Sequence, residues 1–146
     1  MPPARTARGH WLVKSEPGTY AWQDLVKDGR TRWDGVRNAQ ARNNLRAMRA
    51  GDRALFYHSG ESREVVGVAE VVRTAYPDPT TDDERWLAVD VAPVAPLREP
   101  VPLSAVKADP ALAKLPLVTQ SRLSVMPIEA RAFARILKLA KTALSD

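Results

Sequence analysis

The chain has 146 residues, 45% hydrophobic content and a formal net charge of +5, which indicates one globular domain and makes a polyanion a suitable partner. It contains no cysteine and two histidines, so disulfides, cysteine zinc sites and thiol nucleophiles are excluded, and we expect neither a metal nor a cofactor. No apolar run suits a signal segment or a membrane span, so we expect a cytoplasmic protein that can reach the nucleoid and does not bind membranes. The domain is expected to span residues 10–146, after a disordered tail at 1–9.

The first expected elements are a strand and a short helix. The strand covers residues 10–17 and stops where Pro17 removes a backbone donor, which leaves the Lys-Ser-Glu trio at 14–16 on the strand's end. The helix is expected to run from Thr19, a suitable N-cap, to Gly29, a suitable C-terminal stop.

An irregular segment with Trp33 and Gly35 precedes a second expected helix. Asn38 can cap this helix, which should continue to about Ala50, where Gly51 supplies a stop. One face carries apolar side chains at helical spacing, namely Ala41, Leu45 and Met48. The opposite face carries guanidiniums at the same spacing, namely Arg42, Arg46 and Arg49.

The middle of the chain is strand-like. Residues 52–59, 63–77 and 85–94 are rich in valine and aromatic side chains and are separated by turn-forming segments. We expect them to be consecutive antiparallel strands.

The C-terminal third is broken by prolines. Residues 98–110 are expected to form a loop with one helical turn at 103–107, and 120–127 to hold a short strand. A last helix should have Pro127 in its first turn and end near Leu144. The order of strand, helices, strands and helix predicts an α+β domain on a small curled sheet.

Residues 33–48 combine one Trp, four amides and three guanidiniums. Guanidiniums neutralise phosphates, amides pair with base edges, and an indole offers a face on which a base can stack. Each has a plainer alternative: Trp33 as a core residue, the arginines as a solvated face, and Asn38 as a cap only. Asn43 and Asn44 cost helix propensity, which favours a role beyond the helix itself.

Two polar trios lie at strand ends, Lys-Ser-Glu at 14–16 and Tyr-His-Ser at 57–59. Each could simply satisfy turn backbone, but together they favour a polar pocket. A lysine or glutamate in such a pocket can also serve as a base toward a hydroxyl, so a hydrolase stays an alternative. No nucleophile elbow or phosphate loop accompanies them, and we therefore predict a protein that is not an enzyme.

Six segments in series, "WLVKSEP", "WDGVRNAQARNNLRAM", "GDRALFYHS", "VVGVAEV", "AYPDPT" and "SRLSVMP", resemble the EVE domain family over about residues 10–141. The resemblance implies a PUA-like pseudobarrel, a bent antiparallel β-sheet flanked by α-helices. It also implies a pocket for a flipped, chemically modified base, because the family is associated with modified cytosines in DNA and its YTH relatives with methylated adenine in RNA.

The resemblance also implies the residues that bind the base. We expect Trp33 to stack on it, Ser15, Asn38 and Ser59 to hydrogen-bond its edge, and Arg37, Arg42 and Arg122 to hold phosphates. The full implied set is Lys14, Ser15, Glu16, Trp33, Val36, Arg37, Asn38, Ala41, Arg42, Asn43, Tyr57, His58, Ser59, Ser121, Arg122 and Leu123.

The sequence therefore predicts a nucleic-acid-binding module that recognises a modified base, with modified cytosine in DNA as the favoured ligand. Two alternatives stay open. One is an amidohydrolase-like enzyme acting on modified nucleosides, by fold-level analogy with other PUA-like proteins. The other is an RNA-binding PUA-like protein, for which contacts to the 2′-hydroxyl would select the sugar.

Overall fold

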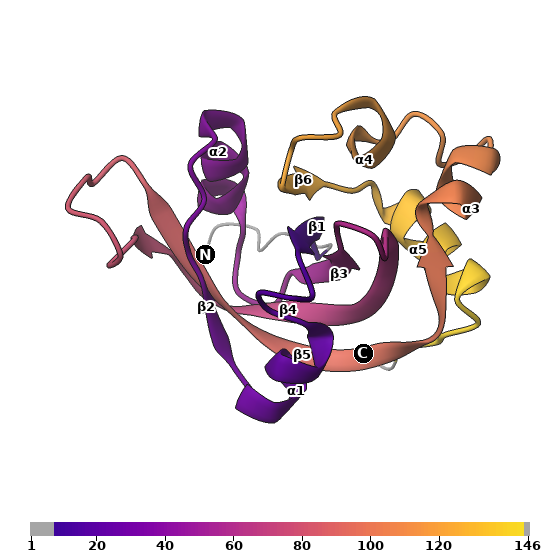
Figure 1. Ribbon diagram of the computed structural model, residues 1–146, viewed down its shortest axis with the longest axis horizontal. Coiled ribbons are helices and arrows are strands. Elements are labelled where there is room, and N and C mark those ends of the chain that lie inside the picture. The colour runs from indigo at the N-terminus through magenta and orange to yellow at the C-terminus, as the bar shows by residue number, and fades with distance from the viewer. Residues whose placement is uncertain (1–7, 145–146) are drawn as a thin grey trace, which may run out of the picture.

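The computed structural model describes residues 8–144 and is an α+β fold built on one curled sheet (Figure 1). The strands are β1 (His10–Ser15), β2 (Thr31–Trp33), β3 (Arg53–His58), β4 (Glu64–Pro77), β5 (Leu87–Pro102) and β6 (Val125–Pro127). The helices are α1 (Trp22–Asp28), α2 (Ala39–Ala47), α3 (Leu103–Ala108), α4 (Pro116–Thr119) and α5 (Ala130–Leu139). Most of the tail expected at 1–9 lies outside the described residues. Gly9 is within them, and its carbonyl oxygen accepts a hydrogen bond from the Arg53 amide at 3.1 Å.

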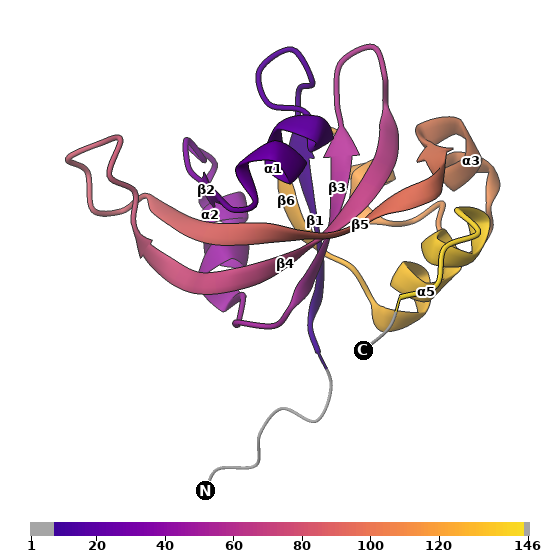
Figure 2. The same cartoon turned by 90° about the horizontal axis from the view of Figure 1, so that it is seen from below.

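The sheet has the strand order β2-β5-β4-β3-β1-β6. Its neighbours are antiparallel except β1 and β3, which are parallel. A parallel pair needs a long crossover, and here the connection from β1 to β3 contains α1, β2 and α2. The predicted fold class is confirmed, with one correction: the sheet is mixed rather than antiparallel throughout. The long strands β4 and β5 curl it into a half-barrel (Figures 1 and 2).

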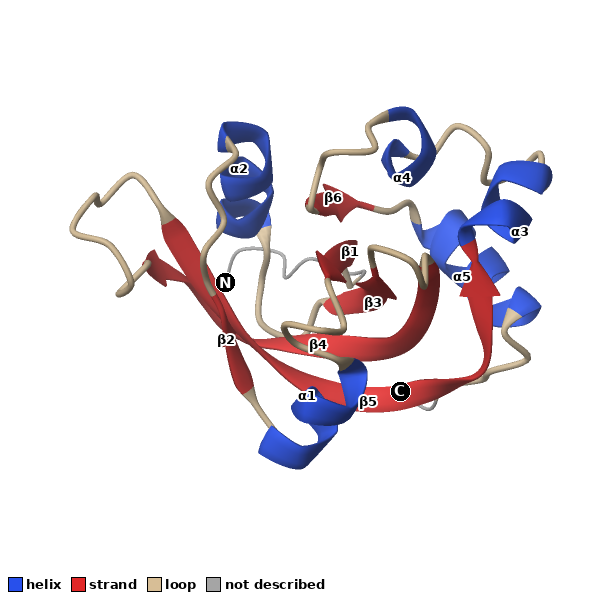
Figure 3. Cartoon of the chain, in the orientation of Figure 1, coloured by secondary structure: helices blue, strands red, loops and turns tan. Residues whose placement is uncertain are grey.

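Apart from α1, which packs beside β5, the helices gather at the two ends of the sheet. Figure 3 shows α2 at one end, while α3, α4 and α5 lie together at the other. The tip of the β4–β5 hairpin extends past the sheet on the α2 side (Figures 1 and 2). Among the described residues, no helix is long and apolar enough to cross a membrane.

Strand β5 is longer than predicted. It continues through Pro102, so the loop expected from residue 98 is wrong. Beyond Val91, β5 pairs with β4 alone among the described strands. A proline is tolerated there where its missing N–H would point away from β4. Bulges opposite this part of β5, between Val65 and Gly67 and between Val68 and Ala69, add the curvature.

The first two helices begin and end close to the expected positions. Helix α1 begins at Trp22, after Ala21 rather than Thr19, and the Asp24 carboxylate accepts a hydrogen bond from the Ala21 amide at 2.8 Å. Gly29 ends α1 with φ 74°, as predicted. The Asn38 cap of α2 is confirmed, because its side chain accepts a hydrogen bond from the Ala41 amide at 2.9 Å. Helix α2 ends at Ala47, three residues before the expected end.

The C-terminal elements differ more from expectation. The helical turn after residue 102 is present as α3, and the short strand is present as β6. Pro127 is the last residue of β6 and not part of a helix, because α5 begins only at Ala130 and ends at Leu139. The short elements β2 and α4 were not predicted.

Three aromatic side chains connect the core to the α2 end of the sheet. The ring of Phe56 meets those of Trp22 and Trp33 edge to face, each at a centroid distance of 5.5 Å. Trp22 lies so close over Gly67 that a Cβ there would come within 2.6 Å of the indole. This packing fixes Trp33 in place from the core side.

Candidate functional site

A pocket of about 500 Å³ opens at the α2 end of the sheet, within the range of roughly 300–1,000 Å³ that is usual for small-molecule sites. The end of β1, strand β2 and the segment leading into α2 form most of its wall. The lining residues are Lys14, Ser15, Thr19, Tyr20, Thr31, Arg32, Trp33, Asp34, Gly35, Val36, Arg37, Asn38 and Ser124. Thr31 and Trp33 alternate with Arg32 along β2 and so share one face of the strand.

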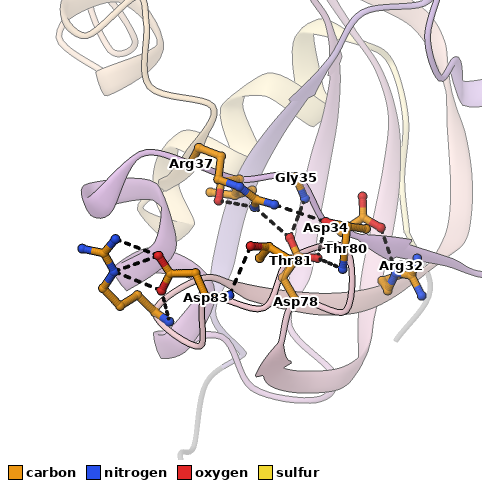
Figure 4. A network of polar contacts seen from close by, with 10 residues as sticks. Arg32, Asp34, Gly35, Arg37, Asp78, Thr80, Thr81 and Asp83 are labelled. Atoms are coloured by element: carbon orange, nitrogen blue, oxygen red, sulfur yellow. Dashed lines mark hydrogen bonds and ion pairs between the residues drawn. The ribbon is translucent and has the colours of Figure 1, made fainter.

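One buried carboxylate holds the wall between β2 and α2. The side chain of Asp78, in the β4–β5 hairpin, is fully buried and accepts hydrogen bonds from the Gly35 amide at 2.9 Å and from Arg37 Nη1 at 2.8 Å (Figure 4). Its other oxygen accepts from the amide and the hydroxyl of Thr80, at 2.8 and 2.6 Å. Gly35 adopts φ 77°, a left-handed conformation that glycine tolerates without strain. The hairpin therefore fixes the backbone that turns from β2 into α2.

These contacts determine the charge state of Asp78. Burial alone would raise its pKa, but hydrogen bonds from Thr80, Arg37 and the Gly35 amide outweigh burial and hold the pKa well below its usual range. The carboxylate is therefore ionised at neutral pH, paired with a guanidinium that lines the pocket.

The β1 side of the pocket is fixed by Lys14 and Ser15. Lys14 Nζ donates to the carbonyl oxygen of Ser121 at 2.9 Å, which joins the end of β1 to the loop before β6. Burial lowers the pKa of Lys14. Ser15 Oγ donates to the carbonyl oxygen of Tyr20 at 2.6 Å, so its lone pairs, rather than its proton, are left for a ligand.

A second hollow adjoins the pocket, and Asn38 lines both. It has a volume of about 320 Å³ and is lined by Asn38, Gln40, Thr119, Gln120, Ser121, Arg122 and Leu123. No carboxylate is among these lining residues. The two hollows form a polar path from Trp33 across the start of α2 to the loop before β6.

The expected site residues fall into four groups. Those that line the pocket are Lys14, Ser15, Trp33, Val36, Arg37 and Asn38; those that line the second hollow with Asn38 are Ser121, Arg122 and Leu123. Arg42 and Asn43 lie on α2, where Arg42 hydrogen-bonds to the Asn43 side chain. Neither the pocket nor the second hollow is lined by Arg42 and Asn43, or by the remaining five residues, Glu16, Ala41, Tyr57, His58 and Ser59.

Each of these five lies elsewhere for a clear reason. Ala41 and Tyr57 are buried in the core. His58 is also buried; its Nε2 accepts a hydrogen bond from the Trp22 amide at 3.0 Å, and burial lowers its pKa. Glu16 and Ser59 line a separate hollow between the β1–α1 and β3–β4 loops.

The sequence did not single out several residues that line the pocket, among them Tyr20, Thr31, Asp34 and Ser124. Asp34 could have been predicted as a site residue, because it stands next to Trp33 in the polar segment at residues 33–48. Tyr20, Thr31 and Ser124 carry no such signal, since tertiary folding alone brings them there.

Trp86, in the same hairpin as Asp78, was not predicted as a site residue either. Three guanidinium carbons lie near its ring centroid: Arg42 at 5.6 Å, Arg37 at 5.8 Å and Arg85 at 5.9 Å. Such cation–π contacts order side chains that would otherwise be flexible. Within residues 8–144, Arg37 and Arg85 have carboxylate partners, whereas Arg42 has none.

The chain is similar to a known protein family and to proteins of known structure. The EVE domain family matches residues 9–139. Human thymocyte nuclear protein 1 is 34% identical over 164 residues, which cover 89% of this chain and 73% of that protein.

Solved structures agree with the sequence match. A protein from Agrobacterium tumefaciens superposes with a TM-score of 0.91 at 41% identity, over 94% of this chain and 99% of that one. The human THYN1 protein in complex with 5-methylcytosine containing DNA superposes with a TM-score of 0.84 at 34% identity, over 92% and 99% of the two chains. The YTH domain of the Zygosaccharomyces rouxii MRB1 protein has a TM-score of 0.56 at 20% identity, which shows a shared fold alone.

Proposed function

This chain belongs to the EVE domain family, and we propose that it binds DNA and recognises a modified cytosine that is flipped into the Trp33 pocket. The observation that carries the proposal is the pocket itself, which combines an aromatic wall with amide, hydroxyl and cationic groups. A chain of similar fold was solved in complex with 5-methylcytosine containing DNA. We place the protein in the cytoplasm with access to the nucleoid, as the sequence predicts.

Trp33 is the residue that we assign to stacking. Its side chain lines the pocket, but only 8% of the residue is exposed, because Phe56 packs against it from the core. A base that lies on the indole therefore meets a rigid surface, which costs little side-chain entropy. Stacking on an aromatic is worth about 1–3 kcal/mol per base, enough to offset much of the cost of unstacking.

The second hollow supports a path for the strand that carries the flipped base. Arg122 lies in that hollow and Arg42 on the first turn of α2, and neither has a carboxylate partner within residues 8–144. Both guanidiniums are therefore available to phosphates. Arg37 is already bound to Asp78 and Thr80, so we assign it to shaping the wall as well as to charge.

We propose a binding module rather than an enzyme. A hydrolase would need Lys14, Ser15 and Glu16 at one centre, yet Glu16 lies in a different hollow from the other two. The Ser15 proton is donated to a backbone carbonyl rather than to a base. Incubation with acylated nucleosides at high protein concentration should therefore release no product.

The test compares matched duplexes that carry one cytosine, 5-methylcytosine or 5-hydroxymethylcytosine at fixed salt, with RNA of the same sequence as competitor. We expect a modified base to be bound about tenfold or more tightly than cytosine, because a pocket that fits an added group gains roughly 1–3 kcal/mol from it. DNA should be preferred to RNA.

Substitutions inside the pocket, with one outside it as the control, connect that preference to the pocket. Thr31→Trp should abolish it by filling the pocket, whereas Thr74→Trp, at an exposed threonine of β4 outside the pocket lining, should not. Trp33→Phe keeps an aromatic ring and should retain part of the affinity. Equal affinity for all three duplexes, undiminished in Trp33→Ala, would refute the proposal.

A further inference from the structure

The polar groups that line the pocket are mostly donors. They comprise one ammonium, two guanidiniums, an amide and several hydroxyls, and Asp34 is the single carboxylate among the lining residues. A carboxylate accepts hydrogen bonds and offers no proton at neutral pH. Asp34 is therefore the group in the wall most able to distinguish a ligand's amine from its carbonyl.

Asp34 has acceptor capacity left for a ligand. Its Oδ2 accepts a hydrogen bond from Arg32 Nε at 2.8 Å, an ion pair that orients the carboxylate. Its Oδ1 has no hydrogen-bond partner within residues 8–144, and 32% of the side chain is exposed. Two other lining groups are already committed, Arg37 to Asp78 and the side-chain oxygen Oδ1 of Asn38 to the Ala41 amide. Ser15 Oγ keeps acceptor lone pairs, but it is uncharged and therefore a weaker acceptor than a carboxylate.

The bases that fit this pocket differ in hydrogen bonding at two adjacent positions, the exocyclic group on C4 and the ring nitrogen N3, which carries a proton in thymine but not in cytosine. Cytosine carries the amine N4, which donates, whereas thymine carries the oxygen O4, which accepts. 5-Methylcytosine and thymine have nearly the same outline, including the methyl group, so shape cannot separate them. A carboxylate facing the exocyclic group, rather than N3, bonds to the amine N4 and repels the lone pairs of O4.

We propose that Asp34 accepts a hydrogen bond from the exocyclic amine of the flipped base and thereby makes the site specific for amino-pyrimidines over oxo-pyrimidines. This inference rests on the proposed function, since it requires a base in the Trp33 pocket. The methyl group and the amine are then detected separately, the first by fit and the second by Asp34.

The experiment measures affinity for duplexes that carry 5-methylcytosine, cytosine or thymine opposite an abasic site, which equalises the cost of flipping. The wild type should bind 5-methylcytosine at least about tenfold more tightly than thymine, as expected for one discriminating base contact. In Asp34→Asn that ratio should fall close to one, because an amide can either accept from N4 or donate to O4. Asp34→Ala should weaken binding of 5-methylcytosine most.

The chain supplies a matched control. Asp83 pairs with Arg85 two residues away, as Asp34 pairs with Arg32, but Asp83 does not line the pocket. Asp83→Asn removes the same charge and should leave the ratio unchanged. The intact mass of the Asp34→Asn variant must be checked, because an asparagine before Gly35 deamidates readily. The melting temperature of the variant shows whether it is folded.

The possible results separate this inference from the proposed function. If the wild type prefers 5-methylcytosine to cytosine but folded Asp34→Asn keeps the wild-type ratio to thymine, Asp34 does not detect the amine and the inference fails alone. If the wild type binds all three duplexes equally and filling the pocket changes nothing, no base enters the pocket and both fail. Loss of the thymine discrimination in Asp34→Asn, with Asp83→Asn unaffected, supports it.

Discussion

Both ends of the curled sheet contain apolar packing, but the backbone at the α2 end depends in addition on hydrogen bonds to one buried carboxylate. At the α5 end, Phe133 and Ile136 of α5 are buried in the core together with Leu112, which lies between α3 and α4, and Leu117 of α4. At the α2 end, the turn from β2 into α2 depends on hydrogen bonds to one buried carboxylate, Asp78. Apolar burial is non-directional, whereas hydrogen bonds to an ionised group fix the positions of particular atoms. The end that presents the pocket therefore adds directional hydrogen bonds to its apolar packing.

The largest expected effect on stability lies at the α5 end. Ile136→Ala removes a fully buried side chain of α5 and should lower the free energy of unfolding by about 2–5 kcal/mol, because it leaves a cavity. Chemical denaturation measures the loss. Affinity of the remaining folded protein for the modified duplex should stay at the wild-type value, and a parallel loss of base discrimination would show that the two ends are coupled.

At the α2 end, a loss of stability should be accompanied by a loss of base discrimination. Asp78→Asn keeps the shape but removes the charge bonded to Arg37, Gly35 and Thr80, and should cost about 1–3 kcal/mol of stability. Discrimination between 5-methylcytosine and cytosine should fall with it, since the pocket wall loses its support. Asp83→Asn, at an exposed pair in the same hairpin, is the control and should change neither.

The same contact has a pH signature. Because the folded state holds the pKa of Asp78 below its usual range, Asp78 contributes stability above the ordinary value of about 3.9 and loses that contribution as pH falls further. The difference in melting temperature between wild type and Asp78→Asn should therefore be largest near neutral pH and shrink below about pH 4. A constant difference across that range would mean that ionisation of Asp78 does not stabilise the fold.

A smaller effect is expected at the turn itself. Gly35→Ala places a side chain at φ 77° and should cost about 1 kcal/mol through backbone strain. Gly18→Ala is the control, because Gly18 has neither a positive φ nor a neighbour within 4 Å of an added Cβ. Thermal melts of both variants measure the difference, and equal melting temperatures would show that the turn is not constrained.

The smallest effect concerns charge. Arg42→Ala removes a guanidinium that has no carboxylate partner within the described part of the chain, and should reduce the slope of log affinity against log salt by about 0.9 if it contacts one phosphate. It should weaken methylated and unmethylated duplexes equally. Arg131→Ala, an exposed arginine of α5 at the other end of the sheet, should leave the slope unchanged.

The difference between the two ends also explains what the sequence could predict. The Gly29 stop and the Asn38 cap were predictable because both depend on residues within one helical turn. The length of β5 was not, because its prolines are acceptable only where the strand lacks a second partner. The fold class followed from the order of elements, and the family from six segments in series.

The site was predictable only in part, for the same reason. Trp33, Val36 and Asn38 could be named because they lie together in one polar segment. Asp78 could not, because it is 43 residues from Gly35 in sequence and meets it only through the hairpin. His58 has a side chain that often takes part in function, but here it is buried and its Nε2 accepts a hydrogen bond from the Trp22 amide.

The central claim is that the modified base enters the pocket at Trp33. The most direct measurement is the NMR spectrum of the protein with a short duplex carrying one 5-methylcytosine, with the Trp33 indole signal assigned through Trp33→Phe. We predict large shifts of the Trp33 indole, the Gly35 amide and the Asn38 side chain, which the unmethylated duplex does not reproduce. Binding of the methylated duplex that leaves these three signals unmoved, or that moves them equally with unmethylated DNA, would contradict the claim.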